Sequence, residues 1–194
     1  MAIDQFLDQL LILIRLKSIR RTGWVETNIR NPESVADHSF NVAILALLLG
    51  DEENVDRTKV LKMALVHDLA EAIIGDMVWQ RGQFVDVKLK KEKDVLEMQA
   101  IEEILNSIDD KVTKSRFKEI RDLMQEYIEQ NSIESQLVKE LDKLEMCIQA
   151  LAYYQDSPFE EITSFLDSAR DYVHTEQGKN LFNEIERRII ELGL

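Results

Sequence analysis

The sequence predicts an all-α protein, a single-domain helical bundle spanning residues 1–194, on three observations. The chain has only six glycines and two prolines, too few for the turns of a β-sandwich or a β-barrel. Apolar side chains recur at helical spacing in most segments, and none alternates convincingly with polar residues over the length of a strand. Hydrophobic residues make up 45% and charged residues 31%, so a chain of this length can bury a core without disulfides.

The first helix is expected over residues 3–19. Its apolar side chains follow the three- and four-residue spacing of a single buried face: Phe6, Leu7, Leu10, Leu11 and Ile14. A loop containing Gly23 follows this helix and leads to the break at Asn31 and Pro32.

The second expected helix has two possible starts. Asn31 would cap it with Pro32 at the first helical position, or Ser34 and Asp37 would form a capping box. The helix runs to about residue 49 and is apolar nearly all round, so we expect it at the centre of the bundle.

The third expected helix covers residues 57–73 and stops at Gly75, a residue that commonly ends helices. Residues 77–86 contain Gly82 and are expected to form a loop. Further helices complete the bundle over residues 88–107, 111–130, 132–154, 159–174 and 179–191. No linker or composition shift marks a domain boundary.

Charge is distributed unevenly along the chain. The net charge of −13 argues against broad, sequence-blind binding of nucleic acid polymers, which requires a basic surface. Residues 15–30 nevertheless form a basic island, with five cations against Glu26. This island either lines a pocket for a small anion or complements the dipole at the end of the first helix, and both interpretations stay open.

Cysteine usage and hydropathy indicate the compartment. Cys147 is the single cysteine, which excludes an internal disulfide and is typical of a reducing environment. The longest strongly apolar stretch, residues 42–49, is far too short to span a membrane. Asp4 and Asp8 precede the apolar run of residues 10–14, which is unlike a signal peptide. We therefore expect a cytoplasmic protein with no membrane partner.

The most informative segment is residues 64–76, which reads ALVHDLAEAIIGD. On a continuous helix, Asp68 lies about 100° and Glu71 about 40° round from His67, so the three side chains share one sector. Asp76 follows just past the expected helix end. One imidazole and up to three carboxylates are therefore expected around a common point.

This group has two interpretations. A His-Asp pair taken alone is more often a satisfied polar pair at a helix surface than a metal site. Here apolar neighbours limit solvation, and burying three ionisable groups without a counter-charge is costly. A divalent transition metal such as Mn²⁺, Co²⁺, Fe²⁺ or Zn²⁺ would supply that charge and activate water, and a carboxylate that does not bind it would move a proton.

The other histidines and one aspartate are weaker candidates on spacing alone. His38 lies near a helix N-terminus, where the dipole favours a neutral ring able to bind metal, although such a residue read alone is more often a core histidine that donates to a carbonyl. Asp142 lies beside the buried face of the 132–154 helix, so it would point inward, yet it resembles any acidic helix residue. His174 lies in a polar segment and is expected to be exposed.

Three longer stretches carry a resemblance to a known family. They are RRTGWVETNIRNPESVADHSFNVA, ALVHDLAEAIIGD and KELDKLEMCIQALAYY. His38, then His67-Asp68, then the distant Asp142 resemble the H…HD…D signature of the HD superfamily of metal-dependent phosphohydrolases. The flanking residues are similar to the HD-domain 5′-deoxynucleotidase family over residues 11–154, with a looser tail over 157–192.

The resemblance implies a single helical HD domain that is usually homodimeric. It implies hydrolysis of deoxyribonucleoside 5′-monophosphates to deoxynucleoside and phosphate, with one divalent ion such as Co²⁺ or Mn²⁺. The implied metal ligands are His38, His67, Asp68 and Asp142. Glu71 and Asp76 are the implied acid-base residues. We assign Glu71 to the attacking water and Asp76 to the leaving group, and the reversed assignment is the alternative.

The resemblance also implies substrate contacts. Trp24 matches an aromatic position near the sugar, although a core tryptophan that anchors the loop is the alternative. Gly23 replaces the arginine that precedes this tryptophan in the bacterial branch, so Arg20 or Arg21 would hold the phosphate instead. Lys143 directly follows Asp142 and would approach the same phosphate.

Two other functions remain as alternatives. The first is another HD reaction, on a nucleoside triphosphate, a cyclic nucleotide or a guanosine tetraphosphate alarmone, but the small basic island favours a monophosphate. The second is a non-catalytic module that binds a metal or a nucleotide. Glu71 and Asp76 argue against it, because a binding scaffold does not need them.

Overall fold

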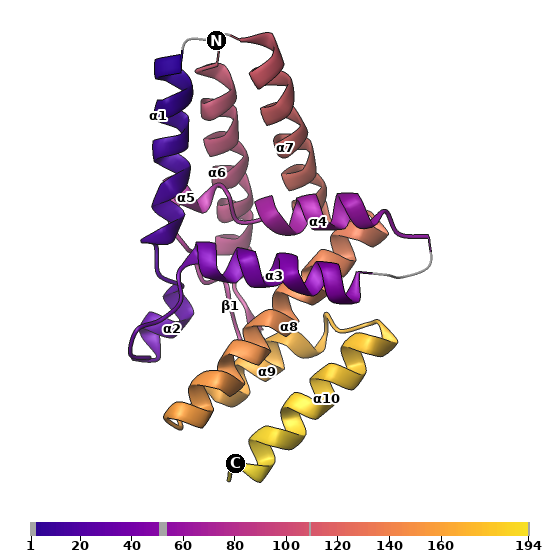
Figure 1. Ribbon diagram of the computed structural model, residues 1–194. Coiled ribbons are helices and arrows are strands. Elements are labelled where there is room, and N and C mark those ends of the chain that lie inside the picture. Colours follow the sequence, from indigo (N-terminus) through magenta and orange to yellow (C-terminus); the bar gives the residue numbers. More distant parts are fainter. Residues whose placement is uncertain (1–2, 51–53, 109, 194) are drawn as a thin grey trace.

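The computed structural model describes residues 3–50, 54–108 and 110–193. Within these ranges the chain is mainly helical, with one short antiparallel hairpin (Figure 1). The elements are α1 (Ile3–Leu13), the 3-10 helix η1 (Ile14–Lys17), α2 (Thr22–Glu26), α3 (Val35–Leu49), α4 (Arg57–Val66), α5 (Glu71–Ile74), β1 (Gln80–Arg81), β2 (Phe84–Val85), α6 (Val87–Asn106), α7 (Lys111–Glu129), α8 (Ile133–Asp156), α9 (Ile162–Arg170) and α10 (Glu176–Glu191).

The helix α8 is the central element of the bundle. It packs against α3, α4, α7, α9 and α10, and buried side chains line it along most of its length. In Figure 1, α1, α6 and α7 stand side by side above α3 and α4, which cross in front of α8. The predicted all-α fold is confirmed, and the core surrounds the middle of α8.

The first helix is shorter than predicted and turns a different face inward. It ends at Leu13, and η1 continues it. Four of the five residues predicted to be buried are exposed: Leu7, Leu10, Leu11 and Ile14. The inward face instead carries Phe6, Gln9, Leu13 and Leu16. Gln9 donates a hydrogen bond of 2.7 Å to the Ser107 hydroxyl, so a polar residue in the middle of this face conceals its periodicity.

The start of α3 resolves the two alternatives in favour of Ser34. The Ser34 hydroxyl accepts from the backbone N–H of Asp37, and the Asp37 carboxylate accepts from the backbone N–H of Ser34. The helix was expected at the centre of the bundle, and it packs against α4 and α8, but its other side is open. Only the face with Val42 and Ala46 is buried, whereas Phe40 is 62% exposed.

The predicted third helix is interrupted after Val66. Residues 67–70 form a turn between α4 and α5, and backbone N–H groups there donate to carbonyls three residues back, as from Leu69 to Val66 and from Glu71 to Asp68. The chain is therefore wound more tightly than an α-helix, so the 100° spacing does not apply across His67 and Asp68. Gly75 ends α5 with a positive φ of 80°, as its sequence position predicts.

The later elements follow the predicted order with local differences. The expected loop at 77–86 contains the hairpin, in which Gln80 pairs with Val85 and Arg81 with Phe84. The helices α6, α7 and α8 match their predicted ranges within two residues. The helix α9 is shorter than predicted, and α10 begins earlier because Thr175 caps it. No helix in the described ranges is long and apolar enough to cross a membrane.

A buried carboxylate fixes the start of α10 against α8, which leads to the first prediction. Glu140 accepts hydrogen bonds from the backbone N–H groups of His174 and Thr175 and from the Thr175 hydroxyl. A Cβ on Gly178 would lie 1.8 Å from Glu140 Oε1. Gly178→Ala should gain up to about 1 kcal/mol in helix propensity but lose about 1–3 kcal/mol to the clash.

Urea unfolding measures this net loss. Asn180, an exposed residue on the same helix, provides the matched control: Asn180→Ala should change the free energy of unfolding by less than about 0.5 kcal/mol. A Gly178→Ala protein as stable as the wild type would show that Glu140 does not hold a fixed position.

Candidate functional site

Two histidines and two aspartates from separate segments meet inside the bundle. His38 comes from α3, His67 and Asp68 come from the turn after α4, and Asp142 comes from α8. The Nε2 atom of His38 lies 3.1 Å from Asp142 Oδ1 and 3.9 Å from Asp68 Oδ2. The Nε2 atom of His67 lies 3.3 Å from the same Asp68 oxygen. The four side chains are buried, and the structure brings together all four predicted ligands.

One imidazole nitrogen in this cluster is buried without a hydrogen-bond partner. His67 Nδ1 lies 2.8 Å from the Ala64 carbonyl oxygen, so Nδ1 carries the proton and Nε2 presents its lone pair. The Nε2 atom has no hydrogen-bond partner among the described residues. Candidate ligand atoms of His38, His67 and Asp142 lie within 4.8 Å of one another. An imidazole nitrogen without a described partner, beside a second imidazole and a carboxylate at this spacing, fits a divalent transition metal.

Neighbouring side chains orient His38 and Asp142. His38 Nδ1 lies 2.6 Å from Glu145 Oε2, and Asn41 donates to the other Glu145 oxygen at 3.2 Å. Burial acts to lower the pKa of His38, but Glu145 and Asp142 outweigh it and raise the pKa to about 10. The Lys139 ammonium, 2.8 Å from Asp142 Oδ2, helps to hold the pKa of Asp142 well below its usual value despite burial.

The two predicted acid-base residues have different surroundings. Glu71 is fully buried, and its Oε1 accepts from Lys93 at 2.7 Å, whereas its Oε2 has no described partner. Burial and the adjacent Asp68 carboxylate raise the pKa of Glu71 well above its usual value, although Lys93 opposes them. Asp76 instead accepts a hydrogen bond from the backbone N–H of Thr22 at the start of α2.

The structure distinguishes the two candidate arginines. The guanidinium of Arg21 lies 3.1 Å from Asp68 Oδ2 and 3.6 Å from Asp76 Oδ1. Arg20 is exposed, and its guanidinium donates to the Pro32 carbonyl at 3.0 Å. Residue 20 forms a β-bridge with Ser34, and successive side chains of extended backbone point to opposite sides. Arg21 therefore faces the site, and Arg20 faces solvent.

A cavity of about 340 Å³ opens beside the carboxylates. Its lining includes Arg21, Asp68, Asp76, Trp79 and Lys143. The Trp79 ring belongs to the segment before β1, and the ammonium groups of three lysines lie 5.4–5.6 Å from its centroid: Lys90, Lys139 and Lys143. The cavity thus has an acidic wall and a cationic, aromatic wall.

Lys143 is the cation in this wall without an acidic partner in the described ranges. Lys143 is 8% exposed, and its Nζ donates a hydrogen bond to the Gln80 amide oxygen at 3.3 Å. Burial, reinforced by the nearby Lys139 charge, lowers the pKa of Lys143 to about 7. A buried ammonium without a counter-charge is suited to an anionic ligand.

Trp24 is a buried anchor that also touches the cavity. It is 2% exposed, stacks on Phe165 with centroids 4.1 Å apart, and donates from Nε1 to Glu33 at 2.9 Å. These contacts match the alternative interpretation, in which the ring fixes the segment between the first two long helices. Trp24 also belongs to the cavity lining, so part of the residue faces the cavity.

Several site residues escape the sequence analysis. They are Trp79 from the segment before β1, Tyr127 and Lys139 from α7 and α8, and Tyr172 from the loop after α9, and no spacing connects them with the histidines. Lys93 and Glu97 form an i, i+4 pair on α6, which is detectable but is also typical of an exposed helix surface.

Comparisons with known proteins find similar chains. A family model described as an HD domain matches residues 13–184. The 5′-deoxynucleotidase HDDC2 of Dictyostelium discoideum is 37% identical over 94% of this chain and 97% of its own length. The 5′-deoxynucleotidase YGK1 of Saccharomyces cerevisiae is 35% identical over 82% of this chain and 72% of its own.

Solved structures have a similar fold. The PH0347 protein of Pyrococcus horikoshii superimposes with a TM-score of 0.72 at 33% identity, covering 94% of this chain and 99% of that one. The HD domain-containing protein YGK1 superimposes with a TM-score of 0.65 at 25% identity, covering 97% and 86%. The predicted helical architecture is therefore shared with experimentally determined folds.

Proposed function

The chain belongs to the HD domain family, and we propose that it is a 5′-deoxynucleotidase that hydrolyses deoxyribonucleoside 5′-monophosphates. The proposal is carried by two features that meet at Asp68, which lines the cavity and lies 3.3 Å from His67 Nε2. Among the described residues, His67 Nε2 has no hydrogen-bond partner, and the cavity cation Lys143 has no acidic partner. The first feature suits a metal, and the second suits a phosphate. The names of the relatives supply the substrate class.

The proposed ligands of one divalent ion, Co²⁺ or Mn²⁺, are His38, His67, Asp68 and Asp142. When bound, such an ion acts as a Lewis acid toward the phosphoryl oxygens and lowers the pKa of water. Glu145 and the Ala64 carbonyl keep the two rings in the orientation that points Nε2 of each toward Asp68. This fixed orientation pre-forms the site.

Arg21 and Lys143 are the proposed phosphate contacts. Both residues line the cavity, Arg21 beside Asp68 and Lys143 beside the Trp79 ring, so the phosphoryl group would contact both cations. These two cations form a small basic site within a protein whose net charge is −13. A pocket with these cations accommodates one phosphate better than the longer anion of a nucleoside triphosphate.

Glu71 and Asp76 are the proposed proton-transfer residues. As water attacks phosphorus in line, Glu71 accepts a proton from the water while the new P–O bond forms. The bond from phosphorus to the 5′ oxygen breaks, and Asp76, which must be protonated before the step, gives that oxygen its proton. Oε2 of Glu71 has no partner among the described residues, which supports its assignment to water, whereas the raised pKa of Glu71 supports the reversed assignment, which is the alternative.

Trp24 is the proposed basis of sugar preference. A rigid ring at the cavity wall would exclude an added 2′ hydroxyl, with a preference on the order of 10²-fold or less. Trp24→Phe keeps an aromatic side chain against Phe165 but shortens the ring system. This variant should raise kcat/KM for a ribonucleotide relative to the deoxyribonucleotide with the same base. An unchanged ratio in a folded, metal-loaded variant would assign Trp24 to structure alone.

Phosphate release from a nucleotide panel with Mn²⁺ or Co²⁺ tests the function. The panel contains deoxyribonucleoside and ribonucleoside 5′-monophosphates, triphosphates, cyclic nucleotides and an alarmone. We expect the deoxyribonucleoside 5′-monophosphates to give the highest kcat/KM. A higher value for another class would replace this substrate assignment, and nucleotide binding without turnover would indicate a binding module.

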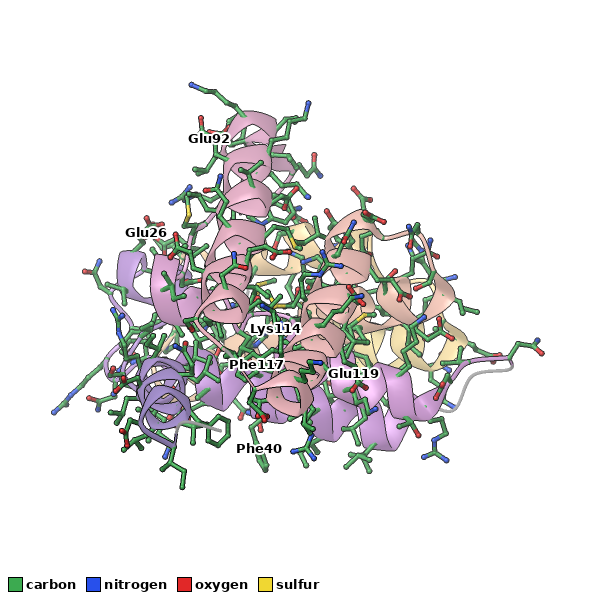
Figure 2. All side chains as sticks on the ribbon, turned by 90° about the horizontal axis from the view of Figure 1, so that it is seen from above. Glu26, Phe40, Glu92, Lys114, Phe117 and Glu119 are labelled. Carbon is green, nitrogen blue, oxygen red and sulfur yellow. The ribbon has the colours of Figure 1, made fainter. Side chains whose placement is uncertain are left out.

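We also propose that the protein is a cytoplasmic homodimer. Exposed apolar side chains lie on three elements, of which η1 contacts both others: Leu7 and Leu11 on α1, Ile14 on η1, and Phe40 and Leu48 on α3. Figure 2 shows Phe40 pointing outward from the body of the molecule. Leu48→Glu should shift the mass measured by light scattering to that of one chain, and a monomeric wild type would contradict the assembly.

A further inference from the structure

Glu71 is held by only one of its two carboxylate oxygens. It belongs to α5, a single four-residue turn, which constrains a side chain less than a long helix does. The Lys93 ammonium on α6 donates to Oε1 at 2.7 Å, and Oε2 remains buried without a described partner. One oxygen is thus fixed from a neighbouring helix, while the other has no hydrogen bond to the described residues.

Lys93 also separates a group of carboxylates that would otherwise repel one another. Oxygen atoms of Asp68, Glu71 and Glu97 lie within 4.8 Å of one another. The Lys93 ammonium is 3.3 Å from Glu97 Oε1 as well as 2.7 Å from Glu71. Burial acts to lower the pKa of Lys93, but Glu71 and Glu97 outweigh it and raise that pKa well above its usual value. The ammonium is therefore a permanent cation between these two acids.

We propose that Lys93 is a positioning residue that fixes the Glu71 carboxylate for proton transfer, an inference that rests on the proposed function of Glu71. Without the ammonium, Glu71 would take up a proton or turn away from Glu97 and Asp68, because buried carboxylates at this spacing do not stay ionised together. Either change would remove Glu71 from proton transfer while the substrate contacts Arg21 and Lys143 stayed in place.

Steady-state kinetics of four proteins test this proposal: the wild type, Lys93→Met, Glu71→Gln and the double variant. Methionine keeps the length and apolar stem of lysine but removes the charge. We expect Lys93→Met to lower kcat by about 10-fold or more with KM changed by less than about threefold. In the Glu71→Gln background the same change should alter kcat by less than about twofold, because Lys93 acts through Glu71.

Two variants serve as comparisons. Lys93→Arg retains the charge and should recover part of kcat. Lys88→Met on the same helix removes an exposed lysine that pairs with Glu92, and it should leave kcat unchanged. An equal loss of kcat from Lys93→Met in both backgrounds would overturn the proposal. A rise in KM instead would show that Lys93, which also lines the cavity, binds substrate directly.

Thermal unfolding of the metal-free proteins separates this proposal from the proposed function. Lys93→Met should lower Tm in the wild-type background and lower it less in the Glu71→Gln background, where one of the two repelling carboxylates is gone. This coupling needs no substrate, so it is measurable even if no nucleotide is hydrolysed. Equal Tm losses in both backgrounds would contradict a positioning contact between Lys93 and Glu71.

Discussion

His67→Ala is expected to abolish both metal uptake and phosphate release. The substitution removes the buried Nε2 that has no hydrogen-bond partner in the described chain, and it leaves Asp68 and Asp142 without one of the rings between them. Asp68→Ala should have the same effect, because Asp68 Oδ2 lies near both histidines. Metal content by mass spectrometry and turnover of a deoxyribonucleoside 5′-monophosphate measure the two losses.

A second expectation concerns stability. The proposed ligands come from three parts of the bundle, so a bound ion would tie α3, α8 and the turn after α4 together and raise Tm. His67→Ala should eliminate this metal-dependent rise. His174→Ala is the matched control, because His174 is exposed and remote in sequence from the other two histidines. Full metal occupancy in a His67→Ala, Asp68→Ala double variant would refute the proposed ligand set.

Glu71→Gln is expected to separate binding from chemistry. The amide keeps the size of the side chain but cannot accept a proton from water, so kcat should fall by at least about 10²-fold. Metal content and substrate KM should remain close to those of the wild type, because Glu71 is outside the proposed ligand set. Rapid-quench measurement of a single turnover places the loss in the chemical step.

The exposed carboxylate Glu92 provides the control, and Glu92→Gln should retain wild-type kcat. If kcat of the Glu71→Gln protein stays within a few-fold of the wild-type value, then Asp76 removes the proton or the water reacts without a protein base. Loss of the metal in the same variant would instead make Glu71 a ligand.

Local sequence patterns predict the parts of the fold that local chemistry determines. The capping box at Ser34 and the stop at Gly75 each depend on residues within a few positions, and both occur as the sequence indicates. The inward face of α1 is different, because Gln9 is buried through a bond to Ser107, almost a hundred positions away. Apolar periodicity cannot identify a face whose central residue is polar.

In the candidate site too, local sequence predicts some residues and only the tertiary structure reveals the others. The sequence places His67, Asp68 and Glu71 together even though the turn at 67–70 breaks the helix that the argument assumes. It cannot separate Arg20 from Arg21, because that choice depends on a single β-bridge in an extended segment. Lys93 and Trp79 reach the cavity from α6 and the hairpin region, so only the tertiary structure connects them with the histidines.

The central claim is that one divalent ion, held by His38, His67, Asp68 and Asp142, is required for hydrolysis of a deoxyribonucleoside 5′-monophosphate. Chelation followed by titration with Mn²⁺ or Co²⁺, with bound metal and phosphate release measured on the same samples, tests it most directly. We expect the chelated protein to be inactive and activity to rise with occupancy until about one ion is bound per chain. Full activity in protein with less than about 0.1 ion per chain would contradict the claim.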